Sequence, residues 1–409
     1  MNYLHKLANL PREERAEKGI EYTPFEIESQ PRLWIKNFDI VRKREDEVRS
    51  FIESRIFPKK SPRVILSGAG SSAFIGLAAQ NLLRCKWRLD VDARATTDIV
   101  THWSSIFLKD ADNTMISFSR SGNSPESIGS IILANRFCEK VDHIVVTCNK
   151  QGRLAEVGSD QDRTLLLLLS EETNDKGLAM TASFTTMLMT AQFLACINDL
   201  ENYKQTIGDL SRATEVLFED YSEIIKMISE LGFNRTLFLG SGCLYGCAVE
   251  SSLKLQELTA GRIICKADTF MGVRHGPEAI IDDNTIVVYF LSTDPFIRRY
   301  ELDLVKEIDL KGVGMKKIVV CNRADRKIER CVDYTIEFDK DDVFKIPDAY
   351  RPVMDVTVGQ MMGLFKSLDL NLKPDRPSER GIINRTVRGV RIYDHETFRK
   401  ERRFKVIPE

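Results

Sequence analysis

Short runs of β-branched residues recur along the chain and alternate with longer stretches in which apolar residues return at helical spacing. The runs are nearly continuous, as in strands that are covered on both faces, and they include Val64–Leu66, Ile144–Val146, Ile286–Val288 and Ile318–Val320. Residues 124–140 ("SPESIGSIILANRFCEK") lie between two such runs, with proline in the first turn and helical apolar spacing. Strands that alternate with helices predict an α/β fold with a parallel sheet between two layers of helices.

Similar segments return in the same order at a spacing of 171 to 174 residues. "RVILSGAGSSAFIG" (63–76) is matched by "RTLFLGSGCLYGCA" (235–248), and "TMISFSRSGN" (114–123) by "TIVVYFLSTD" (285–294). "HIVVTCN" (143–149) is matched by "KIVVCN" (317–322). A fixed spacing indicates tandem copies of one unit. We therefore predict two copies, each a three-layer αβα sandwich with a flavodoxin-like sheet.

The remaining segments differ from the two copies in composition. We predict an N-terminal helical segment (1–45), a first copy (46–198), a helical bridge (199–232), a second copy (233–372) and a Pro/Gly/Arg-rich C-terminal tail (373–409). A chain of 409 residues is long enough for two or three such domains.

Composition excludes several classes of protein. The 59 basic and 60 acidic residues nearly cancel, so no nucleic-acid partner is expected. No apolar run approaches the roughly 20 residues of a membrane span, and the charged first residues do not resemble a signal peptide. The nine cysteines include no CxxC pair, which argues against a disulfide framework or a zinc site, and we interpret Cys243 and Cys247 as small buried thiols. We expect a cytoplasmic protein with no membrane partner.

A serine-rich turn follows one strand of the first copy. Ser119, Ser121, Asn123 and Ser124 lie around Gly122, whereas the second copy has "LSTDP" at the matching place. Free N–H groups at a strand-to-helix turn, together with hydroxyls, bind phosphate oxygens. The turn at Gly68–Ser72 adds Ser71 and Ser72, and Arg120 adds a charge. A turn that only caps a helix is the alternative; two such turns in one copy favour an anion site.

The second copy carries candidate catalytic groups. A helix after Gly242 would place Glu250, Lys254 and Glu257 on one face, at positions i, i+4 and i+7. A solvated stripe of ion pairs is the alternative interpretation. His275 lies in the loop sequence "RHGP", where an imidazole suits proton transfer but is often incidental.

These motifs resemble those of the SIS (sugar isomerase) family: "GAGSS", "SRSGNSPES", "ESSLKLQELTAG" and "FMGVRHGPEAIIDD". The wider match over about residues 20–393, including "EETNDKGLAMTASFTTM" (171–187) and the tail, is similar to the branch of tagatose-6-phosphate ketose/aldose isomerases, also described as galactosamine-6-phosphate deaminase/isomerases. The resemblance implies two tandem SIS domains, a phosphorylated-sugar substrate and a homodimer or homotetramer.

The resemblance also implies roles for individual residues. Glu257 would be the general base with Lys254 beside it, and His275 would open the sugar ring, often in the neighbouring subunit. The phosphate would be bound by the first-copy turns, through Ser71, Ser72, Ser119, Arg120, Ser121 and Ser124. Further substrate contacts are expected from Gly70, Asn123, Ala179, Thr181 and Arg388.

Two departures from the related glucosamine-6-phosphate synthase limit the comparison. This sequence shows no glutaminase domain with its N-terminal cysteine nucleophile, so we do not expect synthesis of glucosamine 6-phosphate from glutamine. Arg388 aligns with a catalytic lysine of the synthase, and an arginine is too basic to form a Schiff base.

The predicted reaction converts D-galactosamine 6-phosphate to D-tagatose 6-phosphate and ammonia. Ring opening, proton transfer from C2 to C1 and hydrolysis of a ketimine need no metal or redox cofactor. An isomerase without deamination, a sugar-phosphate sensor and a fructosamine-phosphate deglycase remain alternatives. A sensor would not need both Glu257 and His275.

Overall fold

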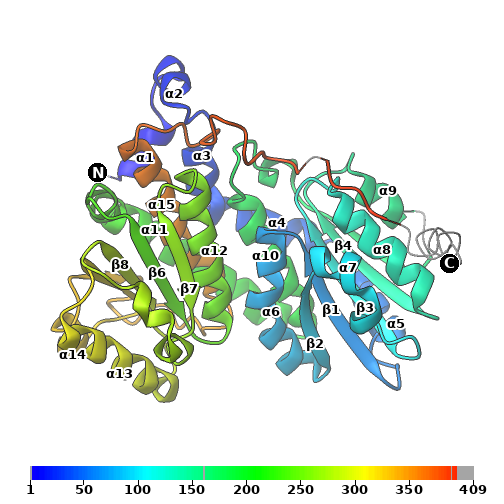
Figure 1. Ribbon diagram of the computed structural model, residues 1–409. Coiled ribbons are helices and arrows are strands. Elements are labelled where there is room, and N and C mark those ends of the chain that lie inside the picture. Colours follow the sequence, from blue (N-terminus) through cyan, green and yellow to red (C-terminus); the bar gives the residue numbers. More distant parts are fainter. Residues whose placement is uncertain (1, 160–161, 388, 394–409) are drawn as a thin grey trace, which may run out of the picture.

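A computed structural model describes residues 2–159, 162–387 and 389–393. It contains two parallel five-stranded sheets, which lie on the two sides of the molecule in Figure 1. The strand orders are β2-β1-β3-β4-β5 and β7-β6-β8-β9-β10, so the second sheet repeats the connectivity of the first. The prediction of two tandem α/β units with a flavodoxin-like strand order is confirmed.

The first sheet has five strands, two of which contain the predicted apolar runs Val64–Leu66 and Ile144–Val146. The five strands are β1 (Pro62–Gly68), β2 (Asp90–Ala95), β3 (Asp112–Ser119), β4 (Val141–Thr147) and β5 (Thr164–Leu168). The connecting helices are α6 (Ser71–Trp87), α7 (Thr96–Ile106), α8 (Pro125–Phe137) and α9 (Arg153–Ser159), and η1 (Glu171–Thr173) and α10 (Ala182–Ala195) follow β5.

The second sheet has the same plan. Its strands are β6 (Arg235–Gly240), β7 (Ile264–Asp268), β8 (Thr285–Phe290), β9 (Lys316–Cys321) and β10 (Tyr334–Glu337). The helices are α12 (Cys243–Leu258), α13 (Pro295–Lys311), α14 (Arg326–Glu329) and α15 (Pro352–Asp369). Two short turns of 3-10 helix, η2 (Gly272–His275) and η3 (Pro277–Ile280), replace a helix between β7 and β8.

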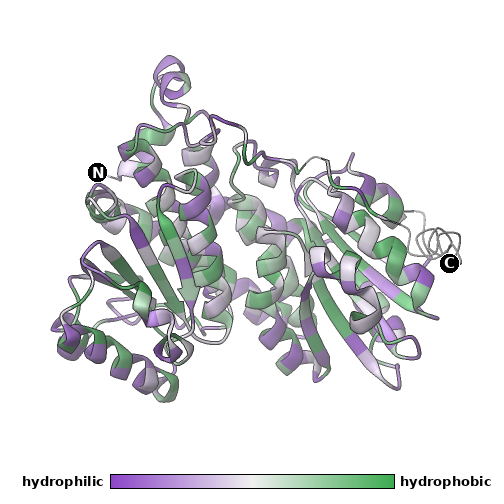
Figure 2. Cartoon of the chain, in the orientation of Figure 1, coloured by the Kyte–Doolittle hydropathy of each residue, from purple (hydrophilic) through white to green (hydrophobic). Residues whose placement is uncertain are grey.

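One hydrophobic core joins the inner faces of both sheets. Val64 of β1 and Phe238 of β6 belong to the same buried cluster, together with residues of α4 (Gln30–Arg42), α6, α10, α11 (Leu200–Ser229), α12 and α15. Separate clusters lie on the outer faces, under α7 and α8 on the first sheet and under α13 on the second. Figure 2 shows the apolar strands inside both halves and polar residues along the outside of α13. Burial on both faces explains the continuous apolar runs of the inner strands, such as β8 (TIVVYF) and the end of β9 (IVVC).

Helices α6 and α12 pack against each other in opposite directions. The backbone of Ala78 lies so close to Gly246 that a Cβ there would be 2.6 Å from the Ala78 nitrogen. The first residue of α6, Ser71, contacts Lys254 near the end of α12. The carboxyl edge of the first sheet therefore adjoins the C-terminal end of α12.

The N-terminal helices and the segment between the sheets complete the fold. They are α1 (Tyr3–Ala8), α2 (Arg12–Lys18), α3 (Thr23–Glu28), α4 (Gln30–Arg42), α5 (Glu45–Arg55) and α11 (Leu200–Ser229), which lies within the predicted bridge. The tail runs from α15 across the top of the molecule to α8, where Ile392 lies against Gly129 (Figure 1). None of the described helices is long and apolar enough to cross a membrane.

Candidate active site

The two serine turns of the first copy follow the neighbouring strands β1 and β3, which pair in parallel with Ser67 opposite Ser117. In this strand order the chain leaves β1 and β3 in opposite directions along the sheet, and ligands of such sheets bind in the crevice formed there. Gly70 has a positive φ of 57° and open space around it. The fold thus places both serine turns at the same edge of the first sheet, as the sequence predicted.

The hydroxyls of the second turn have defined partners. Ser119 Oγ accepts a hydrogen bond from the Gly122 nitrogen at 3.1 Å, and Ser121 Oγ accepts one from the Asn123 nitrogen at 3.2 Å. Ser124 occupies the N-cap position of α8, but its hydroxyl makes no capping bond and donates to Glu126 Oε2 at 2.7 Å. The hydroxyl of Ser124 therefore leaves the N–H groups of the first turn of α8 free of a side-chain cap.

The matching turn of the second copy already holds a carboxylate. Asp348 Oδ1 accepts hydrogen bonds from the nitrogen and the hydroxyl of Thr293, each at 2.8 Å, and Asp348 Oδ2 accepts one from Ser292. Arg351 Nη1 donates to Asp348 at 2.9 Å and Arg351 Nη2 to the buried Asp355 at 2.7 Å. Although this carboxylate is largely buried, Arg351 and the hydrogen bonds from Ser292 and Thr293 hold the pKa of Asp348 below its usual value. An internal anion thus occupies the second copy's turn.

Helix α12 brings its charged face to the first copy rather than to solvent. Lys254 Nζ donates to Ser71 Oγ at 2.9 Å and to Glu257 Oε2 at 2.7 Å, and lies 3.2 Å from Glu250 Oε1. The side chains of Lys254 and Glu250 are fully buried, whereas Glu257 is 25% exposed. The helical face is as predicted, and the alternative of a solvated stripe is wrong.

Burial and charge shift the proton affinities of this group. Burial raises the pKa of Glu250 to about 7, and the charge of Lys254 opposes part of that rise. Burial disfavours the ammonium form of Lys254, but Glu250 and Glu257 outweigh this and raise the pKa of Lys254 above its usual value. Lys254 is therefore a fixed positive charge beside Glu257.

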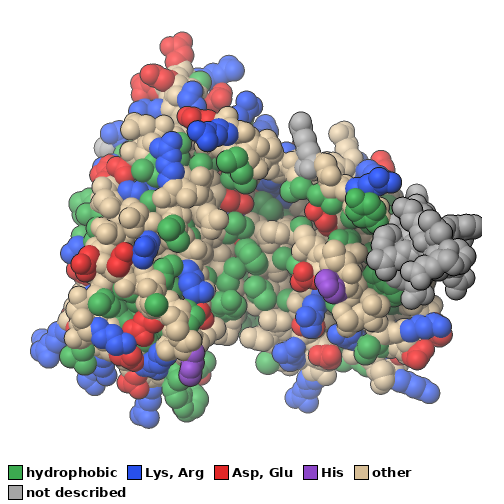
Figure 3. Space-filling model, viewed as in Figure 1, with side chains coloured by type: hydrophobic (Ala, Val, Ile, Leu, Met, Phe, Trp, Pro, Cys, Tyr) green, Lys and Arg blue, Asp and Glu red, His purple; other side chains and the backbone are tan. Residues whose placement is uncertain are grey.

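Glu257 opens onto a groove of about 570 Å³ between the end of α12 and the tail. Its lining includes Gln256 and Arg262 from the α12 side, and Pro377, Ser378, Glu379, Arg380, Ile382 and Ile383 from the tail. Figure 3 shows a hollow between the two halves of the molecule, with apolar side chains on its floor.

His275 lies on the other side of the second sheet from α12. Val273, two residues earlier, packs in the cluster that contains Leu237 and Leu239 of β6. Phe238, between them, points to the opposite face and packs in the core that contains α12. The second sheet therefore lies between the exposed His275 and the face that carries α12 with Glu257 of the same chain.

The loop before α10 contains two further predicted residues. Thr181 is fully buried, and its nitrogen and hydroxyl donate to Asp175 at 2.9 and 2.8 Å. The Ala179 carbonyl faces the guanidinium of Arg120, which is 7% exposed. Ser72, also buried, contacts Met180 of this loop. Arg388 lies outside the described residues.

Several residues of the site were missed by sequence reasoning. Gly246 permits the close approach of α6 and α12, and a glycine inside a predicted helix, which costs about 1 kcal/mol relative to alanine, was the available signal. The tail residues that line the groove gave no signal, because their positions depend on contacts distant in sequence.

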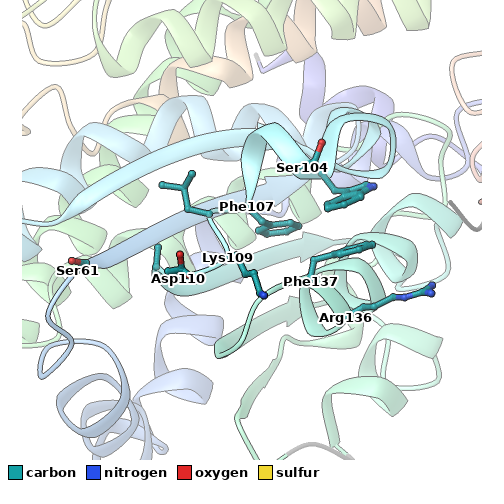
Figure 4. Close-up of a pocket in the computed structure, with 10 residues that line it drawn as sticks. Ser61, Ser104, Phe107, Lys109, Asp110, Arg136 and Phe137 are labelled. Carbon is teal, nitrogen blue, oxygen red and sulfur yellow. The ribbon is translucent and has the colours of Figure 1, made fainter. Parts of the chain in front are cut away.

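A second cavity of about 870 Å³ lies at the opposite, amino edge of the first sheet. The stacked rings of Trp103 and Phe137, with Phe107 and Lys109, line it (Figure 4). It contains none of the predicted site residues, and ligands of parallel sheets bind at the other edge. Among the described residues, no group of three or more His, Cys, Asp or Glu side chains is placed to hold a metal ion.

Comparison with known proteins agrees with this architecture. Residues 57–197 match the model of the SIS domain. The D-galactosamine-6-phosphate deaminase AgaS of Escherichia coli is 35% identical over 375 residues, which cover 91% of this chain and 95% of that protein.

Solved structures give the same result over nearly the whole chain. A Clostridium novyi protein described as a candidate tagatose-6-phosphate ketose/aldose isomerase is 37% identical, with a TM-score of 0.89 over 93% of this chain and 97% of that one. The tagatose-6-phosphate ketose/aldose isomerase of Escherichia coli is 32% identical, with a TM-score of 0.83 over 91% and 96%. With two repeated sheets, one set of serine turns and relatives matched over more than nine-tenths of both chains, the chain belongs to the AgaS branch of the SIS family.

Proposed function

We propose that this protein converts D-galactosamine 6-phosphate to D-tagatose 6-phosphate and ammonia. The observation that carries the proposal is the position of Lys254, 2.7 Å from Glu257 Oε2 and 2.9 Å from Ser71 Oγ. Lys254 thereby links the partly exposed carboxylate of Glu257, in the second copy, to the serine turn at the start of α6, in the first copy. The names of the relatives support the choice of substrate.

The first-copy turns would bind the phosphate. The start of α8 and the residues Ser72, Ser119, Ser121 and Ser124 all follow the carboxyl ends of the paired strands β1 and β3. The dipole of α8 and the hydroxyls of these serines favour an anion at this edge. The second copy would bind none, because Asp348 already satisfies its donors.

Glu257 would move the proton. With the sugar ring open, its carboxylate removes the proton from C2 and returns it to C1, which leaves a ketimine at C2. Water adds to this carbon, and ammonia leaves to give the ketose phosphate. The charge of Lys254 stabilises the negative charge that develops on the sugar oxygen at C1 during the transfer.

His275 would open the ring in a neighbouring subunit. Because the second sheet separates His275 from Glu257 within one chain, a site that uses both residues needs two chains. The open groove beside Glu257 is where an exposed loop of a second copy could enter. We therefore propose a homodimer, or a larger homo-oligomer built from such dimers.

An isomerase without deamination is the second candidate, because structural relatives are named ketose/aldose isomerases. The two reactions share every step up to and including the transfer of the proton from C2 to C1, and their substrates differ in the substituent at C2. A substrate with a hydroxyl at C2 would yield a ketose with no ammonia.

Ammonia release from purified protein incubated with galactosamine 6-phosphate tests the proposal. Ammonia and tagatose 6-phosphate should form in equal amounts, and glucosamine 6-phosphate tests selectivity at C4. Turnover of an aldose 6-phosphate without ammonia from any hexosamine phosphate would replace the deaminase by the isomerase. Binding without turnover of either class would indicate a sensor.

A further inference from the structure

Two arginines link the tail to the loop that precedes α10. Arg120, in the first-copy serine turn, donates from Nη2 to the carbonyl oxygen of Arg385 at 2.7 Å. Its Nη1 donates to the carbonyl oxygens of Leu178 and Ala179 at 3.2 and 3.5 Å. One buried guanidinium thus contacts both the loop and the tail.

The second arginine makes the reciprocal contact. Arg385 donates from Nε to the carbonyl oxygen of Asp175 at 2.7 Å and from Nη2 to Asn174 Oδ1 at 2.9 Å. Its own carbonyl is the acceptor for Arg120. The tail at residue 385 is therefore held from both sides.

The loop is the fixed partner of this pair. Glu26 of α3 accepts hydrogen bonds from the nitrogens of Lys176 and Gly177, and the Asp375 carbonyl accepts one from Leu178. Asp175 is itself buried and caps the start of α10. The tail between residues 378 and 385 is largely exposed by contrast, with Ile382 at 81%.

Arg385 lies directly beyond the part of the tail that lines the groove. Ile383, two residues before Arg385, and Ser378 to Arg380 line the groove at Glu257. Release of residue 385 would free this wall at its C-terminal end, while Asp375 keeps the other end tied to Tyr22 and Thr23.

We propose that Arg120 and Arg385 form a clamp that holds the tail as a wall of the active site, and that the Arg120 side chain positions this wall instead of binding the phosphate. The assignment deepens the proposed function, on which its kinetic consequence rests. Burial lowers the pKa of Arg120, and a guanidinium placed in such a setting is stabilised by the carbonyl oxygens that surround it.

Hydrogen exchange of the tail tests the clamp without any substrate. The variants Arg120→Gln and Arg385→Gln should each raise exchange of the hydrogen-bonded tail amides of Gly381 and Ile383 about tenfold, since each variant removes a guanidinium that makes three hydrogen bonds. The matched control is Arg298→Gln in the second copy, where the guanidinium donates to the Ser292 carbonyl and to Asn322, both at 2.6 Å. That variant should leave exchange of the tail unchanged.

Kinetic constants and inhibition by inorganic phosphate distinguish a role of Arg120 in positioning the tail from a role in binding the substrate's phosphate. Both variants should lower kcat about tenfold, the double variant should lower it no further, and the inhibition constant of inorganic phosphate should stay unchanged. Arg120→Lys keeps a positive charge and one donor group, so it should restore part of the protection of the tail amides from hydrogen exchange.

An increased inhibition constant for phosphate in Arg120→Gln, with an unaltered tail in both variants, would overturn the clamp. Because Arg385 is exposed, Arg385→Gln remains informative if the Arg120 variant does not fold. Absence of turnover with every sugar phosphate would contradict the proposed function but would leave the exchange result intact.

Discussion

The ammonium group of Lys254, near the end of α12, donates a hydrogen bond to the hydroxyl of Ser71, the first residue of α6, at 2.9 Å. The two residues belong to different copies of the repeated unit and are 183 positions apart. Their contact arises because α6 and α12 pack in opposite directions around Gly246 and Ala78. It places the charged face of α12 beside the serine turns.

Loss of the Lys254 charge should destabilise the protein through Glu250. Lys254→Met leaves the fully buried Glu250 without its counterion, and we expect the free energy of unfolding to fall by about 3 kcal/mol in urea titrations. The double variant Lys254→Met with Glu250→Gln should recover part of this loss, because no buried charge is left unpaired. Equal stability of Lys254→Met and the unmodified protein would contradict the buried pairing.

Separate defects at Glu257 and His275 should complement each other. Glu257→Gln and His275→Asn should each be inactive, with sugar-phosphate binding retained in Glu257→Gln. Mixed dimers contain one intact site if the two residues come from different chains, so co-refolding should restore about a quarter of the activity. Activity assays before and after mixing check this, and failure of well-mixed dimers to recover would contradict a shared site.

The serine turn of the first copy should affect substrate affinity more than turnover. Ser121→Ala combined with Ser124→Ala should raise KM for the phosphorylated sugar about tenfold, as two hydroxyl donors are lost. Ser292→Ala, at the corresponding turn of the second copy, is the matched control and should leave KM unchanged, because Asp348 fills that turn. An unchanged KM in the double variant would remove these hydroxyls from the site.

Glu26 should make stability depend on pH between about 4.5 and 8. Burial and the neighbouring charge of Asp175 raise the pKa of Glu26 to about 8 in the folded protein. Over this range the unfolded chain releases the Glu26 proton while the folded protein keeps it, so the free energy of unfolding falls as pH rises. Glu26→Gln should flatten this slope and add on the order of 3 kcal/mol at pH 8, measured by urea unfolding across the pH range.

The internal anion of the second copy should be a stability element. Asp348→Asn removes the charge that faces Arg351 and the donors of Thr293, and we expect a loss of about 3 kcal/mol in thermal or urea unfolding. Since the pKa of Asp348 is lowered, its contribution is present above the usual aspartate pKa and is lost as pH falls below it. The ratio kcat/KM should remain unchanged, and a large change would connect this turn to the active site.

The sequence by itself determined the repeated unit, the apolar runs of β1, β4, β8 and β9, and the turns that begin α6, α8 and α12. These features depend on local periodicity, on glycine and proline positions and on a fixed repeat spacing, all of which are visible in one dimension. The serines of residues 119–124 and the face formed by Glu250, Lys254 and Glu257 could be identified in this way.

Only the tertiary structure decided how these parts meet. Whether Lys254 is solvated or buried depends on which surface covers α12, and whether His275 can reach Glu257 depends on the sheet between them. Asp348 accepts hydrogen bonds from Thr293, which lies 55 positions earlier in the chain. Arg120 contacts the tail at Arg385, which lies 265 positions later. Such contacts follow from the packing of two copies around one core, and a repeat pattern contains no information about the relative direction of its copies.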